Sequence, residues 1–138
     1  MPKFKKDKGQ KTIKADNVKG CGNNDFVFIS IKNIQYKFEC FSTWTVAEMN
    51  KFWKFNEKLH NCTWQQVYDT ASKGEEKRGF ALTYIERNKY NSIPFIKDLS
   101  SDIKMFELRV DNKMRVHGFR VDNVFYLCAL DREHQICP

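Results

Sequence analysis

The clearest pattern in the chain is a run of alternating apolar and polar positions between residues 104 and 131. The tetrapeptide RVDN occurs there twice, at residues 109–112 and 120–123, each time after apolar positions. Asp and Asn favour turns because their side chains tolerate left-handed backbone angles and bond to nearby main chain. Each RVDN therefore predicts a strand end and a hairpin tip, and together they predict a three-stranded antiparallel meander.

A three-residue loop at 111–113 followed by a two-residue turn at 122–123 gives this meander a consistent apolar face. A two-residue first loop would instead set Leu108 opposite Arg115 and bring charge into the core, since a slip of one residue reverses every side chain. The expected pairs are Phe106 with Gly118, Leu108 with Val116, Val110 with Met114, Arg120 with Phe125, Gly118 with Leu127 and Val116 with Ala129.

Upstream patterns add strands and helices. The stretches FVFISI and IQYKFECF, separated by Asn33, predict two strands joined by a turn. Capping boxes at Thr45 with Glu48 and at Thr63 with Gln66 predict helices over residues 45–60 and 63–71. The apolar stripe of the first helix is expected from Val46, Met49, Phe52 or Trp53, and Leu59. A charged loop at 72–79, a strand at 79–86 and a short helical turn near 95–101 should follow.

These elements predict an α+β fold, with a small antiparallel sheet that ends in the meander and two helices packed on one face. The 138 residues fit a flexible lysine-rich arm, residues 1–24, and a single domain, residues 25–138. The arm carries a net charge of +5 and the remainder only +2, out of +7 in total. Such an arm can attract phosphates without regard to sequence, or can serve as a solubilising tail.

Cysteine usage and hydropathy indicate the environment of the protein. Five cysteines form no CxxC pair, and no secretory or membrane-spanning apolar run is present. A reduced, soluble, cytoplasmic protein with no membrane association is expected.

The side of the meander opposite its apolar face gathers polar and aromatic groups. Its expected members are Glu107, Arg109, Arg115, His117, Phe119, Tyr126 and Cys128. His134, just beyond the last strand, is placed to reach back towards them. A solvated sheet face is one explanation for this composition. Catalysis is the other, because arginines stabilise charge on a phosphate, while a histidine or an activated tyrosine moves protons.

Those groups suit RNA cleavage without a metal. A base removes the 2′-hydroxyl proton, arginines hold the crowded phosphate, and an acid protonates the leaving 5′-oxygen. DNA lacks that hydroxyl and should resist cleavage. We therefore expect no metal and no cofactor.

The order strand, helix, helix and C-terminal meander, with RVHGFRVDNVFYLCALDREH across the last hairpin, resembles the RelE-like toxins of bacterial toxin–antitoxin systems. The resemblance implies cleavage of RNA, often messenger RNA on the ribosome, and neutralisation by an antitoxin protein. It implies Arg115 as the phosphate-stabilising residue, with His134 or Tyr126 as the acid/base group and His117 assisting. The resemblance implies Arg109, His117 and Arg120 as candidate phosphate contacts, and we expect Arg109, Arg120, Lys113 and Arg132 to contact the RNA. The ending DREHQICP also resembles uncharacterised bacterial proteins, which imply no function.

Other interpretations compete with this one. A non-catalytic module could bind nucleic acid or protein through the basic arm and the polar sheet face, and an immunity or antitoxin-like protein could dock through the same sheet. His60, Cys62, His134 and Cys137 could form a zinc site, although their spacing is not that of a zinc finger. Cysteine catalysis is disfavoured, since Cys128 lies in an apolar strand that should raise its pKa.

Overall fold

The computed structural model describes residues 22–35, 40–69 and 79–138. Its five strands form one sheet in the order β1-β5-β4-β3-β2, and the α+β class is confirmed. The strands are β1 (Phe28–Ser30), β2 (Thr83–Tyr84), β3 (Phe106–Arg109), β4 (Arg115–Val121) and β5 (Val124–Asp131). The helices are α2 (Val46–His60), α3 (Trp64–Asp69) and α4 (Pro94–Lys97), with 3₁₀ helices η1 (Phe41–Thr43) and η2 (Arg87–Tyr90).

The C-terminal meander has the predicted loops and, for most of its length, the predicted register. Phe106 pairs with Gly118, Leu108 with Val116, Gly118 with Leu127 and Arg120 with Phe125. The first loop closes with a hydrogen bond of 2.9 Å from the Val110 N–H to the Met114 carbonyl.

One predicted pair in the meander is wrong. Val116 lies opposite Leu130 and not Ala129, because the register shifts between His117 and Gly118. The extra residue of this β-bulge falls on β5 at Cys128, and it reverses the side-chain alternation beyond that point. Leu130 therefore joins the core beneath the helices, and Ala129 packs on the opposite face.

The N-terminal strand pairing also differs from the expectation. β1 lies parallel to β5, with Phe28 opposite Val124, and so the sheet is mixed and not purely antiparallel. The predicted second strand over residues 34–41 is not observed at its described ends. Ile34 and Gln35 are irregular, Phe41 begins η1, and residues 36–39 lie outside the described part. The Gln35 N–H instead donates to the Cys128 carbonyl, at 2.7 Å.

Both predicted helix starts are confirmed. Thr45 and Glu48 form a complete capping box at α2, and the Thr63 N–H donates to Oε1 of Gln66, at 2.8 Å, at the start of α3. The apolar face of α2 differs from the predicted stripe. Its buried side chains are Phe52, Phe55 and Leu59, whereas Val46 and Trp53 are exposed.

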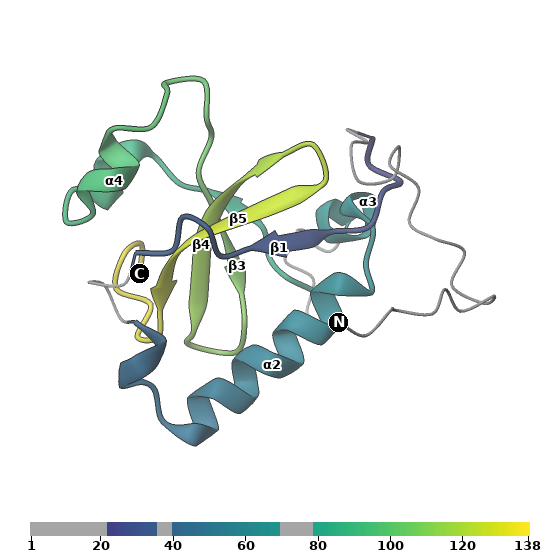
Figure 1. The fold of residues 1–138 in the computed structure, drawn as a ribbon, viewed down its shortest axis with the longest axis horizontal. Coiled ribbons are helices and arrows are strands. Elements are labelled where there is room, and N and C mark those ends of the chain that lie inside the picture. Colours follow the sequence, from purple (N-terminus) through teal and green to yellow (C-terminus); the bar gives the residue numbers. More distant parts are fainter. Residues whose placement is uncertain (1–21, 36–39, 70–78) are drawn as a thin grey trace, which may run out of the picture.

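Two apolar clusters cover the two faces of the sheet. The first lies between α2, α3 and one face, where Phe55, Leu59 and Trp64 meet Phe106 and Leu127. The second lies on the other face beneath η2 and α4; its buried members are Ile85, Tyr90, Ile93, Ile96, Met105, Phe119, Cys128 and Ala129. Figure 1 shows α2 running past the β3–β4 turn, with α4 far from it. Of the two explanations for the polar face, a surface exposed to water does not apply to most of it, because this second cluster covers it.

The segment between α3 and β3 contains less regular secondary structure than predicted. The predicted strand at 79–86 is limited to β2, and the predicted helical turn near 95–101 is found as α4. The lysine-rich arm lies almost wholly outside the described residues, as does most of the charged loop at 72–79. In the part that the structure describes, no helix is long and apolar enough to cross a membrane.

Candidate functional site

Three side chains meet around one carboxylate oxygen at the end of the sheet where β3 and β4 are joined. Oε2 of Glu107 lies 3.2 Å from Nε of Arg115 and 3.6 Å from Nε2 of His134. We call these residues the Glu107–Arg115–His134 cluster. It combines a cation that can hold a phosphate with a group that can move a proton.

Strand pairing brings the cluster together. Glu107 pairs with His117, and Arg109 pairs with Arg115, so their side chains share one sheet face. His134 reaches that face from a turn after β5, where its φ of 56° lies in the left-handed region. The sequence prediction that His134 reaches back is therefore correct in geometry.

The Arg115 guanidinium is held firmly and partly open to solvent. It donates to the carbonyls of Asp111, at 2.8 Å, and Met114, at 3.1 Å. Burial lowers the pKa of Arg115, an effect opposed by the Glu107 carboxylate. An arginine nevertheless keeps its charge near neutral pH. The side chains of Arg115 and Glu107 are 14% and 8% exposed and that of His134 is 28% exposed, so a ligand would reach the cluster from the His134 side.

A second, fully buried set of polar groups lies along the same face. The Tyr90 hydroxyl and Nδ1 of His117 share a hydrogen bond of 2.8 Å, and Nε2 of His117 faces Oδ2 of Asp131 at 3.6 Å. Burial raises the pKa of Tyr90, with a contribution from Glu107, so its hydroxyl stays protonated and can donate to Nδ1. Because the His117 side chain is 0% exposed, it can support the site but cannot touch a substrate in this conformation.

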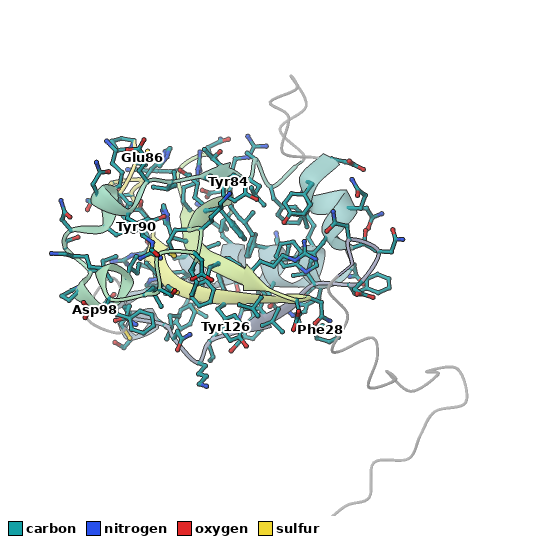
Figure 2. The ribbon with its side chains drawn as sticks, turned by 90° about the horizontal axis from the view of Figure 1, so that it is seen from above. Phe28, Tyr84, Glu86, Tyr90, Asp98 and Tyr126 are labelled. Atoms are coloured by element: carbon teal, nitrogen blue, oxygen red, sulfur yellow. The ribbon has the colours of Figure 1, made fainter. Side chains whose placement is uncertain are left out.

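Tyr126, the other predicted acid–base candidate, lies apart from the cluster. Tyr126 stacks on Phe119 with ring centroids 5.1 Å apart. It precedes Asp131 by five positions, about 16 Å along a strand. In Figure 2, Tyr126 of β5 and Tyr84 of β2 lie towards opposite sides of the view, and strands β4 and β3 lie between β5 and β2 in the sheet.

Arg120 lies on the opposite face of the sheet from Arg115. Its guanidinium lies over the Trp64 ring, at 4.4 Å from the centroid, and donates to the Tyr68 hydroxyl at 3.1 Å. It also donates to Oδ1 of Asn23, at 2.8 Å. These contacts tie α3 and the segment before β1 to the second hairpin.

The remaining predicted arginines and Lys113 are near the cluster but already have partners. Arg132 donates to Oε1 of Glu48, at 3.1 Å, and Lys113 forms an ion pair with Glu133. Arg109 donates to the Gly79 carbonyl, at 3.0 Å, beside a pocket at the edge of the sheet.

Sequence reasoning gave Glu107 a place on the polar face but no role. The signal for its role was weak, because the prediction that His134 reaches back to the polar face did not say which side chain of that face it meets. The contact between Glu107 and His134 depends on the turn after β5 and on the bulge within β5.

The geometry of the described residues does not fit the two alternatives, a zinc site and cysteine catalysis. His60 accepts from the Ile29 N–H at 3.1 Å and shares a 2.8 Å hydrogen bond with the Asn56 carbonyl, so it ties β1 to α2. Among residues 22–35, 40–69 and 79–138, no three His, Cys, Asp or Glu side chains gather where they could hold a metal ion. Burial raises the pKa of the Cys128 thiol to about 12, as the apolar strand predicts, which leaves little thiolate for nucleophilic attack.

Comparisons with known proteins give little beyond this geometry. No protein-family model matches the sequence, and no curated protein matches it. Among solved structures, an archaeal RelE–RelB complex from Pyrococcus horikoshii OT3 is similar, with 15% sequence identity and a TM-score of 0.40, over 78% of this chain and 92% of that chain. Similarity at that level assigns neither a family nor an activity, so the function of this chain has to be inferred from its own side chains.

Proposed function

We propose that this protein is a metal-independent endoribonuclease of the RelE-like toxin type that its sequence resembles. The observation that carries the proposal is that one oxygen of Glu107 lies beside both Nε of Arg115 and Nε2 of His134. A fixed guanidinium and a partly exposed imidazole, held by a shared carboxylate, are the groups that phosphodiester cleavage through a neighbouring hydroxyl requires.

In this mechanism His134 accepts the proton of the 2′-hydroxyl, and the 2′-oxygen attacks the adjacent phosphorus. Arg115 stabilises the negative charge that builds on the phosphate oxygens. The bond to the 5′-oxygen breaks, and that oxygen takes a proton from water. The products are a 2′,3′-cyclic phosphate and a 5′-hydroxyl. Glu107 orients Arg115 and His134 and touches no substrate atom, so it is a positioning residue.

The buried pair His117 and Asp131 lies next to the cluster on the same sheet face. It supports the cluster because His117 pairs with Glu107 across β3 and β4. Toxicity to the host and neutralisation by an antitoxin protein belong to the same proposal.

Cleavage assays with two conservative variants test the assignment of roles. Arg115→Lys keeps a positive charge beside the buried Glu107 but loses the guanidinium geometry. We expect it to lower kcat about 10²–10³-fold, as for removal of other transition-state donors. His134→Gln should lower kcat about 10²–10⁴-fold, the usual contribution of a general acid–base group. Both variants should bind RNA about as tightly as the wild type.

Circular dichroism and thermal unfolding would establish that the two variants are folded. An exposed lysine on α4 offers a control, since Lys97→Gln should leave kcat unchanged. Cleavage by His134→Gln at the wild-type rate would contradict the proposed role of that histidine. Binding without any cleavage by the wild type would favour the non-catalytic binding module.

A further inference from the structure

A pocket of about 310 Å³ opens between α2 and the end of β3, and the β3–β4 turn residue Asp111 lines it. Its α2 side is formed by Lys51, Lys54 and Lys58, and its opposite side by Gly79, Arg109 and Asp111. None of the three lysines is part of the cluster. We call this pocket with its three lysines the α2 basic pocket.

The α2 basic pocket is strongly positive. Four cationic residues line it, the three lysines and Arg109, against the single carboxylate of Asp111. Nζ of Lys51 lies 2.9 Å from Oδ2 of Asp111, so that carboxylate is already paired. Burial alone would raise the pKa of Asp111, but hydrogen bonds from the Met114 N–H and from Lys51 outweigh it, and the pKa ends below its usual value. Asp111 therefore stays ionised near neutral pH, and the lining keeps a net charge of about +3.

The three lysines form a line along the helix. Positions 51, 54 and 58 are three and four residues apart, so they share one helix face. The line spans about 10 Å at about 1.5 Å of rise per residue, which is longer than one phosphate group. Lys51, Lys54 and Lys58 are all exposed, and the side chain of Lys54 makes no hydrogen bond or ion pair within the described part of the chain.

The floor of the pocket is apolar and closed. Phe55 and Phe80 lie there, and both are buried, so neither offers a ring face to a base or to an apolar side chain. Nζ of Lys58 lies 4.9 Å from the Phe80 centroid, which holds the lysine stem against the floor. A ligand would therefore be held by the charges of the lining and would find no aromatic face to stack on.

We propose that the α2 basic pocket binds the sugar–phosphate backbone of single-stranded RNA next to the cleaved bond. This inference rests on the proposed function, because it locates the strand that flanks the scissile phosphate. Two contacts join the pocket to the cluster. Arg109 lines the pocket and pairs with Arg115 across the strands, and the Asp111 carbonyl accepts from the Arg115 guanidinium at 2.8 Å. A strand leaving Arg115 past the β3–β4 turn would meet Lys51 first and then Lys54 and Lys58.

Lysines act as point charges towards phosphates and carry no information about bases. Binding through the pocket should therefore depend on salt and not on sequence. An acidic protein segment would also be attracted by the lysines, but the two contacts that join the pocket to the cluster favour the strand that Arg115 would hold.

Binding of a fluorescent 2′-O-methyl oligouridine, measured over a range of salt concentrations, tests this inference. That probe has the RNA backbone but no free 2′-hydroxyl, so binding is measured whether or not the protein cleaves. The test variant replaces Lys51, Lys54 and Lys58 with Gln. A matched control replaces Lys89, Lys97 and Lys104 with Gln, which removes the same charge from exposed positions on or near η2, α4 and β3.

For a single strand, the slope of log K against log salt should fall by about 0.7 for every phosphate that a lysine no longer neutralises. The slope for the pocket variant should therefore fall by about 2, and this variant should bind about tenfold or more weakly at low salt, while the control stays close to the wild type. Thermal unfolding of both variants would establish that they are folded.

Equal weakening in the two triple variants would assign the effect to net charge and overturn the inference, as would unchanged binding in the pocket variant. Tighter wild-type binding of polyglutamate than of the oligouridine at equal charge would assign the pocket to an acidic protein and overturn it too. Loss of RNA cleavage in His134→Gln alongside normal oligouridine binding would leave this inference standing. Conversely, oligouridine binding by a wild type that cleaves no RNA would contradict the proposed function but not the binding of RNA in the α2 basic pocket.

Discussion

Asp131 is a buried carboxylate that makes several polar contacts. Its two carboxylate oxygens accept from the N–H groups of Gln135 and Ile136, each at 2.8 Å, and Oδ2 faces Nε2 of His117. Burial alone would raise the pKa of Asp131, but these donors outweigh it and the pKa falls below its usual value. The folded protein therefore favours the ionised form of this carboxylate.

Replacement of Asp131 with Asn should destabilise the fold by about 1–3 kcal/mol. An amide can accept through one atom only, so a buried N–H would lose its acceptor. Because the folded pKa of Asp131 is depressed, its stabilisation is complete above the unfolded pKa of about 3.9 and is lost as pH falls through the folded value. Denaturant unfolding of wild type and Asp131→Asn from pH 7 down to pH 2 measures both effects.

The difference in stability between the two proteins should be constant near neutral pH and should shrink at acidic pH. The exposed Asp98 supplies the control, since Asp98→Asn should change stability little. A stability difference that stays the same down to pH 2 would show that Asp131 contributes no pH-dependent stability.

At the scale of the element, the bulge between β4 and β5 sets the geometry of the site end of the sheet. Gly118 sits at the register shift, where the two strands approach closely. A methyl group at Gly118 would lie 2.1 Å from the Tyr126 carbonyl oxygen and 2.7 Å from a Phe125 ring carbon. The first neighbour is backbone and cannot turn away, so only glycine fits.

Gly118→Ala should therefore destabilise the fold by about 3 kcal/mol, the upper end of the range for overpacking, or by more. Thermal unfolding measures the change. Gly22→Ala is the control, because the nearest atom to its added methyl group is 3.9 Å away. A melting temperature of Gly118→Ala equal to that of the control would contradict the close approach of the two strands.

In the meander, the loops and most of the strand register could be predicted from the sequence, whereas the bulge could not. The two RVDN turns and the alternation of Phe106, Leu108 and Val116 were sufficient for the loops and most of the register. Alternation counts residues in steps of two, so it cannot reveal the extra residue at Cys128. The parallel pairing of β1 was not predictable either, since a short apolar run does not specify its neighbour.

The cover over the second sheet face was not predicted, because the turns of its irregular segment are fixed by polar contacts in addition to the apolar cluster beneath it. Arg87 donates to the carbonyls of Ile96, Leu99, Ser100 and Ile103. A single guanidinium thus holds the irregular segment that carries η2 and α4 over the sheet, and nothing in its local sequence distinguishes it from a solvated arginine.

At the scale of the whole molecule, both faces of the sheet are covered in the described chain, whereas the end of the sheet that carries His134 is partly exposed. The helices and the second cluster cover both faces of the sheet, and the charged groups meet where β3 joins β4 and β5 ends. Arg115 and His134 were predictable from residue type and strand position. Glu107 as their link was not, because it required the path of the chain after β5.

Incubation of the purified protein with matched RNA and DNA strands, in the presence of a chelator, tests the central claim most directly. We expect the RNA to be cut to products ending in 2′,3′-cyclic phosphate and the DNA to stay intact, because only RNA carries the attacking hydroxyl. Intact RNA after incubation with folded wild-type protein, or cleavage of both strands alike, would contradict it.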